Sequence, residues 1–381
     1  MNHRVGTMHW IRAHSGEIVL WAIVALTFAV SYWSFVRNQG FFTPDGRYYL
    51  SMAFLFSGDS AEVARERTAD FAAHYGITVP PVDQLFGWGL VQPRIVLPLL
   101  AAPFVKLFGP FGLAATTLLI TVILVIVLTI ILTRRYGMIT AAATMIMVNG
   151  SFYLMSFFGS MLTESLSALW TALALIGGWG WIRTRSARWL VLAGGSTVAS
   201  AFTRQATLIV AGAFLMAWAI GSLVQRRNSQ WMWPAVVVAA ASLGSQLLQS
   251  LVFPSFSQLD QFLRQTGADS LGGALLAVPR LALNILWNDW ILLLRYDRIL
   301  LSLIIIAVAG MLVFWKRVES HLLFGAILAT ALYNITNGTP TQFRYATPGI
   351  VFFIVMTAFV IRRTQTTITH RTSMLREIGP R

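Results

Sequence analysis

The residue best placed to do chemistry in this sequence is a single carboxylate that follows the first long apolar segment. Asp45 lies in FFTPDGRYYL, a few residues beyond that segment. An Asp between Pro and Gly is an ordinary turn residue. A carboxylate at a membrane edge, partly shielded from water, can also accept a proton from a substrate hydroxyl. We therefore take Asp45 as the candidate general base, with a simple turn as the alternative explanation.

Three further charged residues stand beside long segments without charge: Glu164 in SMLTESLSALW, Arg204 in FTRQATLIV and Arg344 in PTQFRYATPG. A charge near hydrocarbon is costly unless it faces a cavity or a partner, so each is a candidate site residue. Arginines at a membrane interface can also simply extend their guanidinium groups to water. Because guanidinium donors match phosphate oxygens, Arg204 and Arg344 are predicted to bind a phosphate group. Glu164 is predicted to orient a sugar or Arg204.

The composition indicates what kind of chain must position these residues. Of the 381 residues, 56% are hydrophobic and only 11% are charged, a balance that predicts lipid as the main solvent. Windows of about 20 apolar residues, long enough for a helix to cross a bilayer, recur along the chain. We predict one all-α, polytopic transmembrane domain over 1–381. Its ten predicted spans are 18–36, 111–133, 138–156, 161–182, 189–202, 206–224, 231–253, 299–315, 320–336 and 345–361.

Basic residues fall on alternate connections between these spans and account for most of the formal net charge of +14. By the positive-inside rule, that side is the cytoplasm. Both termini, including a basic tail over 362–381, are therefore predicted to be cytoplasmic, and the charge does not support nucleic acid binding. The basic residues on this side are Arg4, Arg12, Arg134, Arg135, Arg183, Arg185, Arg188, Arg226, Arg227, Lys316, Arg317 and the arginines after Ile361.

Two predicted outer loops, 37–110 and 254–298, are long, whereas the cytoplasmic connections are short. Residues 93–108 (PRIVLPLLAAPFVKLF) are apolar but contain three prolines and two basic residues, so we predict an interfacial or re-entrant juxtamembrane helix. Residues 282–295 (ALNILWNDWILLLR) are interrupted by polar side chains and are predicted to lie on the outer surface or to enter the membrane only part way. The four charged residues above then all fall on the outer face, where we expect the functional site.

Several short motifs follow one another along the chain. They are Asp45 with Tyr48 and Tyr49; QPRIVLPLLAAPFVKLFG, which includes Gln92 and Arg94; TRRYG after the next span; LTESL around Glu164; and FRYATPG before the last span. Taken in this order, they resemble the GT-C superfamily of integral membrane glycosyltransferases, which use polyprenyl-phosphate sugars as donors. The resemblance covers about residues 18–361. In this family the catalytic acid lies in the first outer loop, so the resemblance singles out Asp45 as the base.

The resemblance implies an inverting glycosyltransferase that moves mannose, arabinose or a similar sugar from a polyprenyl-phosphate carrier to a cell-envelope glycan or glycolipid. It places the site on the extracytoplasmic side of a bacterial plasma membrane. The site residues that it implies are Arg204 and Arg344 for the donor phosphate, and Glu164, Tyr48, Tyr49, Gln92 and Arg94 for orienting the sugar or the acceptor.

One departure from the family concerns metal ions. Several relatives carry a pair of acids where Asp45 is followed here by Gly46, and in the family such pairs go with a metal and a diphosphate-linked donor. The lone Asp45 therefore favours a monophosphate carrier, with no metal or other cofactor. Asp59, Asp83 or Asp289 could still supply a second carboxylate.

Three other functions are compatible with a polytopic chain. A transporter or flippase for a lipid-linked substrate would favour inverted repeats and helices broken near the bilayer midplane, and the sequence shows neither signal. A membrane acyltransferase would usually need a histidine-centred site, and of the six histidines only His74 falls on the outer face. A non-enzymatic scaffold would need neither Asp45 nor Arg344.

Overall fold

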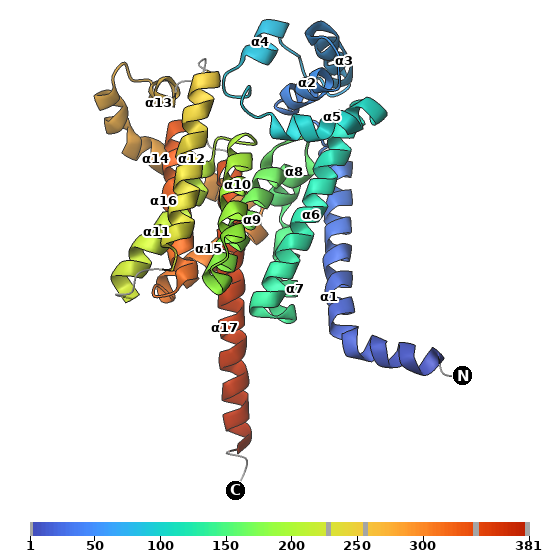
Figure 1. Cartoon of the computed structure of the whole chain (residues 1–381), viewed down its shortest axis with the longest axis vertical. Helices are drawn as coiled ribbons and strands as arrows, with labels where there is room; N and C mark the ends of the chain where they lie inside the picture. Colours follow the sequence, from blue (N-terminus) through green and yellow to red (C-terminus); the bar gives the residue numbers. More distant parts are fainter. Residues whose placement is uncertain (1–2, 226–229, 254–257, 338–342, 378–381) are drawn as a thin grey trace.

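The computed structural model describes residues 3–225, 230–253, 258–337 and 343–377. Over these residues every regular element is a helix, which confirms the all-α prediction (Figure 1). Arg226, Arg227 and the end of the predicted tail lie outside the described residues. The helices are α1 (His3–Asn38), α2 (Gly46–Phe56), α3 (Ala61–Ala73), α4 (Val82–Gly87), α5 (Val96–Phe108), α6 (Phe111–Tyr136), α7 (Met138–Gly150), α8 (Phe152–Gly159), α9 (Glu164–Thr184), α10 (Ala187–Ala201), α11 (Thr207–Gln225), α12 (Met232–Val252), α13 (Gln258–Thr266), α14 (Leu271–Tyr296), α15 (Arg298–Val313), α16 (Val318–Asn337), the 3-10 helix η1 (Arg344–Gly349) and α17 (Ile350–Glu377).

Among the described residues, eight helices are long and apolar enough to cross a membrane, or nine if the bent pair of α7 and α8 forms one span. This is an integral membrane protein. The predicted number of ten spans is not reproduced, and the sides on which the termini lie stay predictions. Seven of the eight helices coincide with predicted spans: Ser15–Asn38, Phe111–Tyr136, Glu164–Thr184, Thr207–Val224, Met232–Val252, Val318–Ile335 and Arg344–Thr367.

The other three predicted spans take a different form. The segment at 138–156 is two helices, α7 and α8, bent by 73°, because Ser151 accepts a hydrogen bond from the backbone N of Leu154 and begins a new helix. The segments at 189–202 and 299–315 correspond to α10 and α15, which have 15 and 16 residues. Both are shorter than the roughly 20 residues that cross a bilayer unaided. Their bounds, Ala187–Ala201 and Arg298–Val313, nevertheless lie close to the predicted ones.

The clearest difference between prediction and structure is α14, a helix of 26 residues that is long and apolar enough to cross a membrane. Its second half was predicted to lie on the outer surface or part way in the membrane. Ser270 caps the helix, and this adds an apolar first half that the prediction did not include. Asp289, whose charge argued against a span, is buried, whereas Leu276 is exposed and suits contact with lipid. The second predicted outer loop, 254–298, is therefore largely helical where it is described.

The first predicted outer loop, 37–110, contains four helices, α2 to α5, which lie together at one end of the bundle (Figure 1). α5 falls within the segment predicted as a juxtamembrane helix. α2 packs against α5 and α3, and Ser51 Oγ donates to Thr68 Oγ1 over 2.9 Å between α2 and α3. α5 turns tightly into α6, where a Cβ on Gly112 would lie only 2.3 Å from the backbone of Phe104. These helices hold the segment around residue 45 over the end of the bundle.

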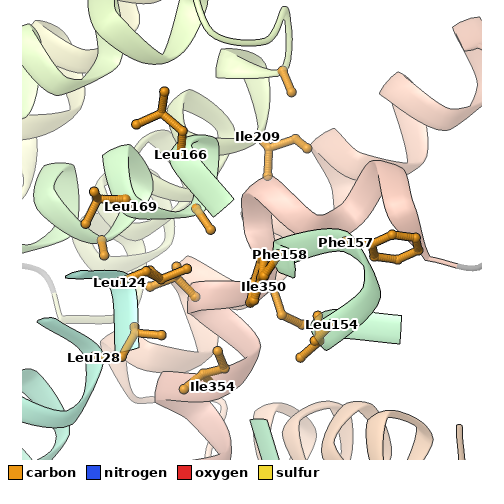
Figure 2. Packing of buried hydrophobic residues seen from close by; sticks show 14 of the residues in the cluster. Leu124, Leu128, Leu154, Phe157, Phe158, Leu166, Leu169, Ile209, Ile350 and Ile354 are labelled. Atoms are coloured by element: carbon orange, nitrogen blue, oxygen red, sulfur yellow. The ribbon is translucent and has the colours of Figure 1, made fainter. Parts of the chain in front are cut away.

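The helices that carry the predicted site residues share one apolar core (Figure 2). In a bilayer, van der Waals packing of this kind holds helices together. Because α9 packs against η1, the core fixes their first residues, Glu164 and Arg344, close to each other. The core side chains drawn from α6, α8, α9, α11 and α17 are Leu124, Leu128, Leu154, Phe157, Phe158, Leu166, Leu169, Ile209, Ile350 and Ile354.

Candidate functional site

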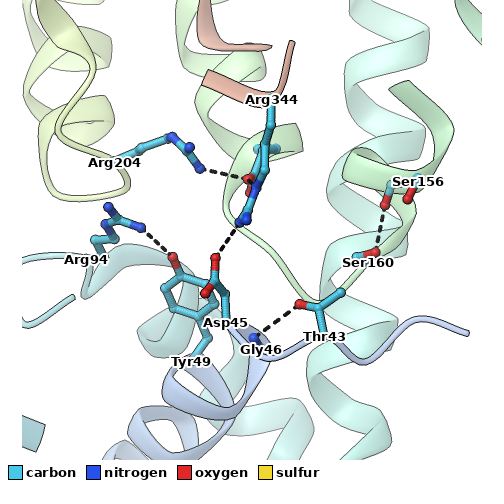
Figure 3. A network of polar contacts seen from close by, with 10 residues as sticks. Thr43, Asp45, Gly46, Tyr49, Arg94, Ser156, Ser160, Arg204 and Arg344 are labelled. Atoms are coloured by element: carbon cyan, nitrogen blue, oxygen red, sulfur yellow. Dashed lines mark hydrogen bonds and ion pairs between the residues drawn. The ribbon is translucent and has the colours of Figure 1, made fainter. Parts of the chain in front are cut away.

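Four of the predicted site residues form one continuous chain of ion pairs (Figure 3). Arg344 Nη2 lies 2.7 Å from Asp45 Oδ2, and Arg344 Nε donates to Glu164 Oε1. The same Glu164 oxygen accepts from Arg204 Nη1 over 2.7 Å. Acids and bases thus alternate along the chain, and the structure brings together residues that are up to 299 positions apart in the sequence.

Glu164 is the centre of this chain. It is the first residue of α9 and is fully buried. A carboxylate is favoured at a helix N-terminus by the helix dipole, and a buried charge needs hydrogen-bonded partners of opposite sign. Arg204 and Arg344 are those partners. Glu164 thus contacts Arg204, and an orienting role for it stays a prediction.

The two arginines predicted to bind phosphate differ in accessibility. The side chain of Arg204 is only 1% exposed, and its guanidinium lies 5.3 Å from the centre of the Tyr345 ring. The side chains of Arg344 and Asp45 are 24% and 37% exposed. A ligand that enters this site therefore meets Arg344 and Asp45 first, while Arg204 lies behind them and holds Glu164.

The backbone next to Arg344 has an unusual conformation. Phe343 has a φ of 69°, in the left-handed region that bulky residues rarely adopt. Its ring lies 5.5 Å from that of Phe353, and this packing stabilises the turn that begins η1. Strained backbone of this kind persists where the surrounding structure imposes it, and it is often found at functional sites. No pattern in the sequence indicated Phe343, although it stands in the FRYATPG motif beside Arg344.

Asp45 reaches this site because its loop packs against the segment that precedes Glu164. Met161 N donates to Phe41 O over 2.8 Å, which fixes the two segments side by side. A Cβ on Gly46 would lie 3.3 Å from Met161 O, a tighter approach than usual. Glycine at this position therefore allows the close contact, which accounts structurally for the absence of a second acid after Asp45.

Tyr49 and Arg94 lie beside Asp45 (Figure 3). Arg94 Nη1 donates to Tyr49 Oη over 2.9 Å, and both side chains are buried. Burial opposes the charge on Arg94, but Tyr49, Tyr333 and Asp45 together raise its pKa above the ordinary value. Arg94 is thus, after Arg344, a second cation near the Asp45 carboxylate, and its orienting role stays a prediction.

Tyr48 and Gln92 each make contacts within the first loop. The Tyr48 ring lies 4.8 Å from that of Trp88, and its hydroxyl accepts from Arg47 over 3.1 Å. Gln92 Nε2 donates to Phe86 O over 2.7 Å. Neither of these contacts joins the ion-pair chain, and the orienting roles of the two residues stay predictions.

Two of the acids named as possible second carboxylates, Asp59 and Asp289, have the following positions in the structure. Asp59 pairs with Arg67 over 2.7 Å, and Asp289 is buried in α14. Within the described part of the chain, no group of three or more His, Asp or Glu side chains is arranged to hold a metal ion. A reaction without a metal stays a prediction.

The ion-pair chain and Arg94 carry three positive and two negative charges, which leaves a net charge of +1 beside a partly exposed carboxylate. This arrangement suits a bound anion next to a proton acceptor. Comparison of the chain with protein-family models, curated proteins and solved structures gave no match. The resemblance to the GT-C superfamily therefore still depends on the order of its motifs, and function has to be inferred from the chemistry of the site.

Proposed function

We propose that this protein is a membrane glycosyltransferase that transfers a sugar from a polyprenyl-phosphate carrier to a hydroxyl of a cell-envelope glycan or glycolipid. One observation carries the proposal: a partly exposed carboxylate, Asp45, lies 2.7 Å from a partly exposed guanidinium, Arg344, that is itself fixed by a buried acid. A base and a phosphate-binding cation thus stand side by side at the end of the helix bundle. We place this end at the outer face of a bacterial plasma membrane.

In the proposed reaction, Asp45 takes the proton of the acceptor hydroxyl. The acceptor oxygen then attacks the anomeric carbon of the donor sugar from the side opposite the phosphate. The bond between that carbon and the phosphate oxygen breaks, and its electron pair leaves with the polyprenyl phosphate. The configuration is inverted without a covalent intermediate. Arg344 stabilises the negative charge that develops on the leaving oxygen, as fixed cationic donors do in other transfer reactions.

The ion pair between Asp45 and Arg344 sets the order of events. Asp45 is occupied by Arg344 Nη2 before the donor enters. A donor phosphate that accepts from this nitrogen takes the place of Asp45 and frees the carboxylate to act as a base. Glu164 Oε1 continues to accept a hydrogen bond from Arg344 Nε, so the guanidinium stays in position. Arg204 acts as a positioning residue through Glu164.

The surroundings of the site suit the two substrates. α5 packs against α2, the helix that follows Asp45. It carries three exposed apolar side chains, Leu99, Leu100 and Leu107, which offer lipid-facing surface for a prenyl chain. Trp88 is exposed and lies against Tyr48, so α4 presents an aromatic face of the kind that sugars contact. We assign α2 to α4 to the acceptor side and α5 to the prenyl chain of the donor.

The experiment uses the full chain in lipid nanodiscs. Radiolabelled polyprenyl-phosphate mannose, arabinose, glucose and galactose are each supplied with a total extract of envelope lipids and glycans, with and without EDTA. We expect transfer from one donor, resistant to EDTA and abolished by Asp45→Asn. Asp59→Asn is the matched control, because Asp59 also pairs with an arginine over 2.7 Å in the same outer segment. No transfer from any donor, or equal loss in both variants, would contradict the proposal.

A transporter for a lipid-linked substrate is the second candidate, and one observation favours it. α7 and α8 form a helix broken by 73°, a feature of many transporter sites. The polar groups at this break are nevertheless used within the protein: Asp297 Oδ2 accepts from Ser151 Oγ over 2.7 Å and from Tyr153 N over 2.8 Å. Ser151 Oγ and Tyr153 N are therefore paired within the protein, and because the partly exposed base and cation lie at the ion-pair chain and not at this break, we prefer the transferase.

A further inference from the structure

A second site lies at the opposite end of the bundle. A cavity of about 910 Å³ opens between the ends of α6, α9 and α11 and the beginnings of α10 and α16. Glu164 begins α9, and Arg183, which lines the cavity, is in its last turn. At 1.5 Å of rise per residue, the two sites are roughly 30 Å apart along the helix. The cavity therefore belongs to a different region from the ion-pair chain.

Four arginines line this cavity: Arg134, Arg135, Arg183 and Arg188. None of the lining residues is acidic. Arg135 pairs with Glu319 over 2.8 Å, but within the described residues the other three arginines form no ion pair. Three cations thus face one space without a counter-charge from the protein. A bound anion would supply it.

The wall of the cavity is also apolar and aromatic. Trp179 and Trp189 line it together with Trp231 and several isoleucines. The Arg135 guanidinium lies 4.2 Å from the centre of the Trp179 ring, and the Arg188 guanidinium lies 5.4 Å from that of Trp189. The indole N–H groups of Trp179 and Trp189 are buried without a hydrogen-bond acceptor. Buried donors are normally satisfied, so this wall can provide further hydrogen bonds to an anionic group after small side-chain rotations.

The local sequence builds this wall. Trp189 packs so closely on α9 that a Cβ on Gly180 would lie 2.2 Å from the indole ring. Glycine at 180 is what allows the ring to lie there. Arg185, between the lining arginines in the sequence, lies instead over Trp181, 5.8 Å from the ring centre, and does not line the cavity. Of the arginines around the connection between α9 and α10, Arg183 and Arg188 therefore line the cavity and Arg185 does not.

We propose that this cavity binds the phosphate group of a membrane lipid, with the acyl or prenyl chain along the apolar wall. Guanidinium forks suit phosphate oxygens, and basic pockets between helices are known to hold anionic lipid headgroups. The volume falls within the range of roughly 300–1,000 Å³ typical of ligand sites. The lipid is either a phospholipid of the bilayer or a polyprenyl phosphate. This proposal does not depend on the function proposed for the other end.

The test is native mass spectrometry of the full chain in detergent, titrated separately with phosphatidylglycerol, polyprenyl phosphate, phosphatidylcholine and inorganic phosphate. The triple variant Arg134→Gln, Arg183→Gln, Arg188→Gln should weaken binding of the preferred lipid by about tenfold, equivalent to about 1.4 kcal/mol. Arg185→Gln is the matched control and should have less than about a twofold effect. Gly221→Leu fills the cavity without changing charge and should also weaken binding, which covers the case of a triple variant that does not fold.

The separate titrations with phosphatidylglycerol and polyprenyl phosphate identify which lipid supplies the phosphate group. Tighter binding of phosphatidylglycerol assigns the site to a bilayer lipid, and tighter binding of polyprenyl phosphate assigns it to a carrier lipid. A photoreactive form of the preferred lipid should label the peptide around residues 176–189. The proposal fails if no lipid binds, if inorganic phosphate competes as well as the lipid, or if Arg185→Gln is as damaging as the triple variant. Asp45→Asn should leave this binding intact, so failure at one site is distinguishable from failure at the other.

Discussion

The two ends of the helix bundle hold arginines in opposite ways. At one end, Arg204 and Arg344 share the carboxylate of Glu164, and Arg344 also reaches Asp45. At the other end, the lining arginines of the cavity outnumber their single acidic partner, Glu319. A guanidinium between two carboxylates is held in one geometry, whereas a guanidinium without a partner takes its geometry from a ligand.

This difference separates positioning from binding. In the ion-pair chain, burial makes each charge depend on the next, because a buried charge without its partner is strongly destabilising. At the cavity, the arginines are mostly exposed and contribute little to stability when they are alone. The first arrangement suits chemistry that needs fixed groups, and the second suits a site that is completed by its ligand.

The largest expected effect is on stability at the ion-pair end. Glu164→Gln would leave Arg204 buried without its carboxylate, and should lower the free energy of unfolding by about 3–5 kcal/mol. Glu66→Gln, an exposed Glu on α3, and Arg183→Gln at the cavity should each change it by less than about 0.5 kcal/mol. Denaturant unfolding in detergent measures all three. Equal changes in the free energy of unfolding for the three variants would contradict the proposed difference between the two ends.

The next effect concerns the fork geometry of Arg344. Lysine has a single ammonium group and cannot offer Nε and Nη2 to two carboxylates at once. Arg344→Lys should therefore reduce transfer from the polyprenyl-phosphate donor by about 100-fold, the usual cost of losing one fixed donor to a developing charge. Arg67→Lys is the control, because Arg67 pairs with only one acid, Asp59. Full activity of Arg344→Lys would show that charge alone is sufficient there.

A smaller effect is expected at Gly46. Gly46→Ala places a Cβ close to Met161 O and should shift the loop of Asp45 by a few tenths of an ångström. Because a misplacement of about 1 Å can cost about 100-fold, we expect this smaller shift to lower transfer by about tenfold. Gly46→Asp places a Cβ at the same position and adds the second acid that several GT-C glycosyltransferases carry there. If that variant is more active than Gly46→Ala, and only when a divalent cation is present, a metal-dependent reaction can be built on this loop.

Much of the fold follows from apolar segment lengths, because the cost of an unpaired backbone in lipid forces apolar runs into helices. Seven spans were predicted in this way and are confirmed as helices long enough to cross a membrane. The differences from the predicted segments occur where a capping residue decides where a helix begins. Ser151 breaks the segment at 138–156, and Ser270 lengthens α14. A hydropathy window averages over such residues and cannot see the hydrogen bond that each of them makes.

The members of the candidate site could be selected from the sequence because charge is rare beside long apolar runs. Of their pairings, only that of Glu164 with Arg204 was named in advance, as one of two alternatives. That Glu164 binds both arginines depends on the packing of α9 against η1, and the burial of Arg204 depends on the whole core. The backbone of Phe343 is set by its contact with Phe353. These tertiary contacts form only in the folded protein and cannot be predicted from the spacing of residues along this chain.

The smallest expected effect is the response to salt, and it separates the two ends without any mutation at the cavity. Raising the ionic strength from about 0.1 M to about 1 M shortens the Debye length from about 10 Å to about 3 Å. Binding of the anionic lipid by the exposed arginines should weaken by about threefold, because their attraction acts through solvent. The stability difference between wild type and Glu164→Gln should stay the same, since the contacts of Glu164 are buried. Lipid titrations and unfolding curves at both salt concentrations measure the two responses. A stability difference that falls with salt would mean that water reaches Glu164, and lipid binding that does not respond would mean that the apolar wall, and not the arginines, holds the lipid.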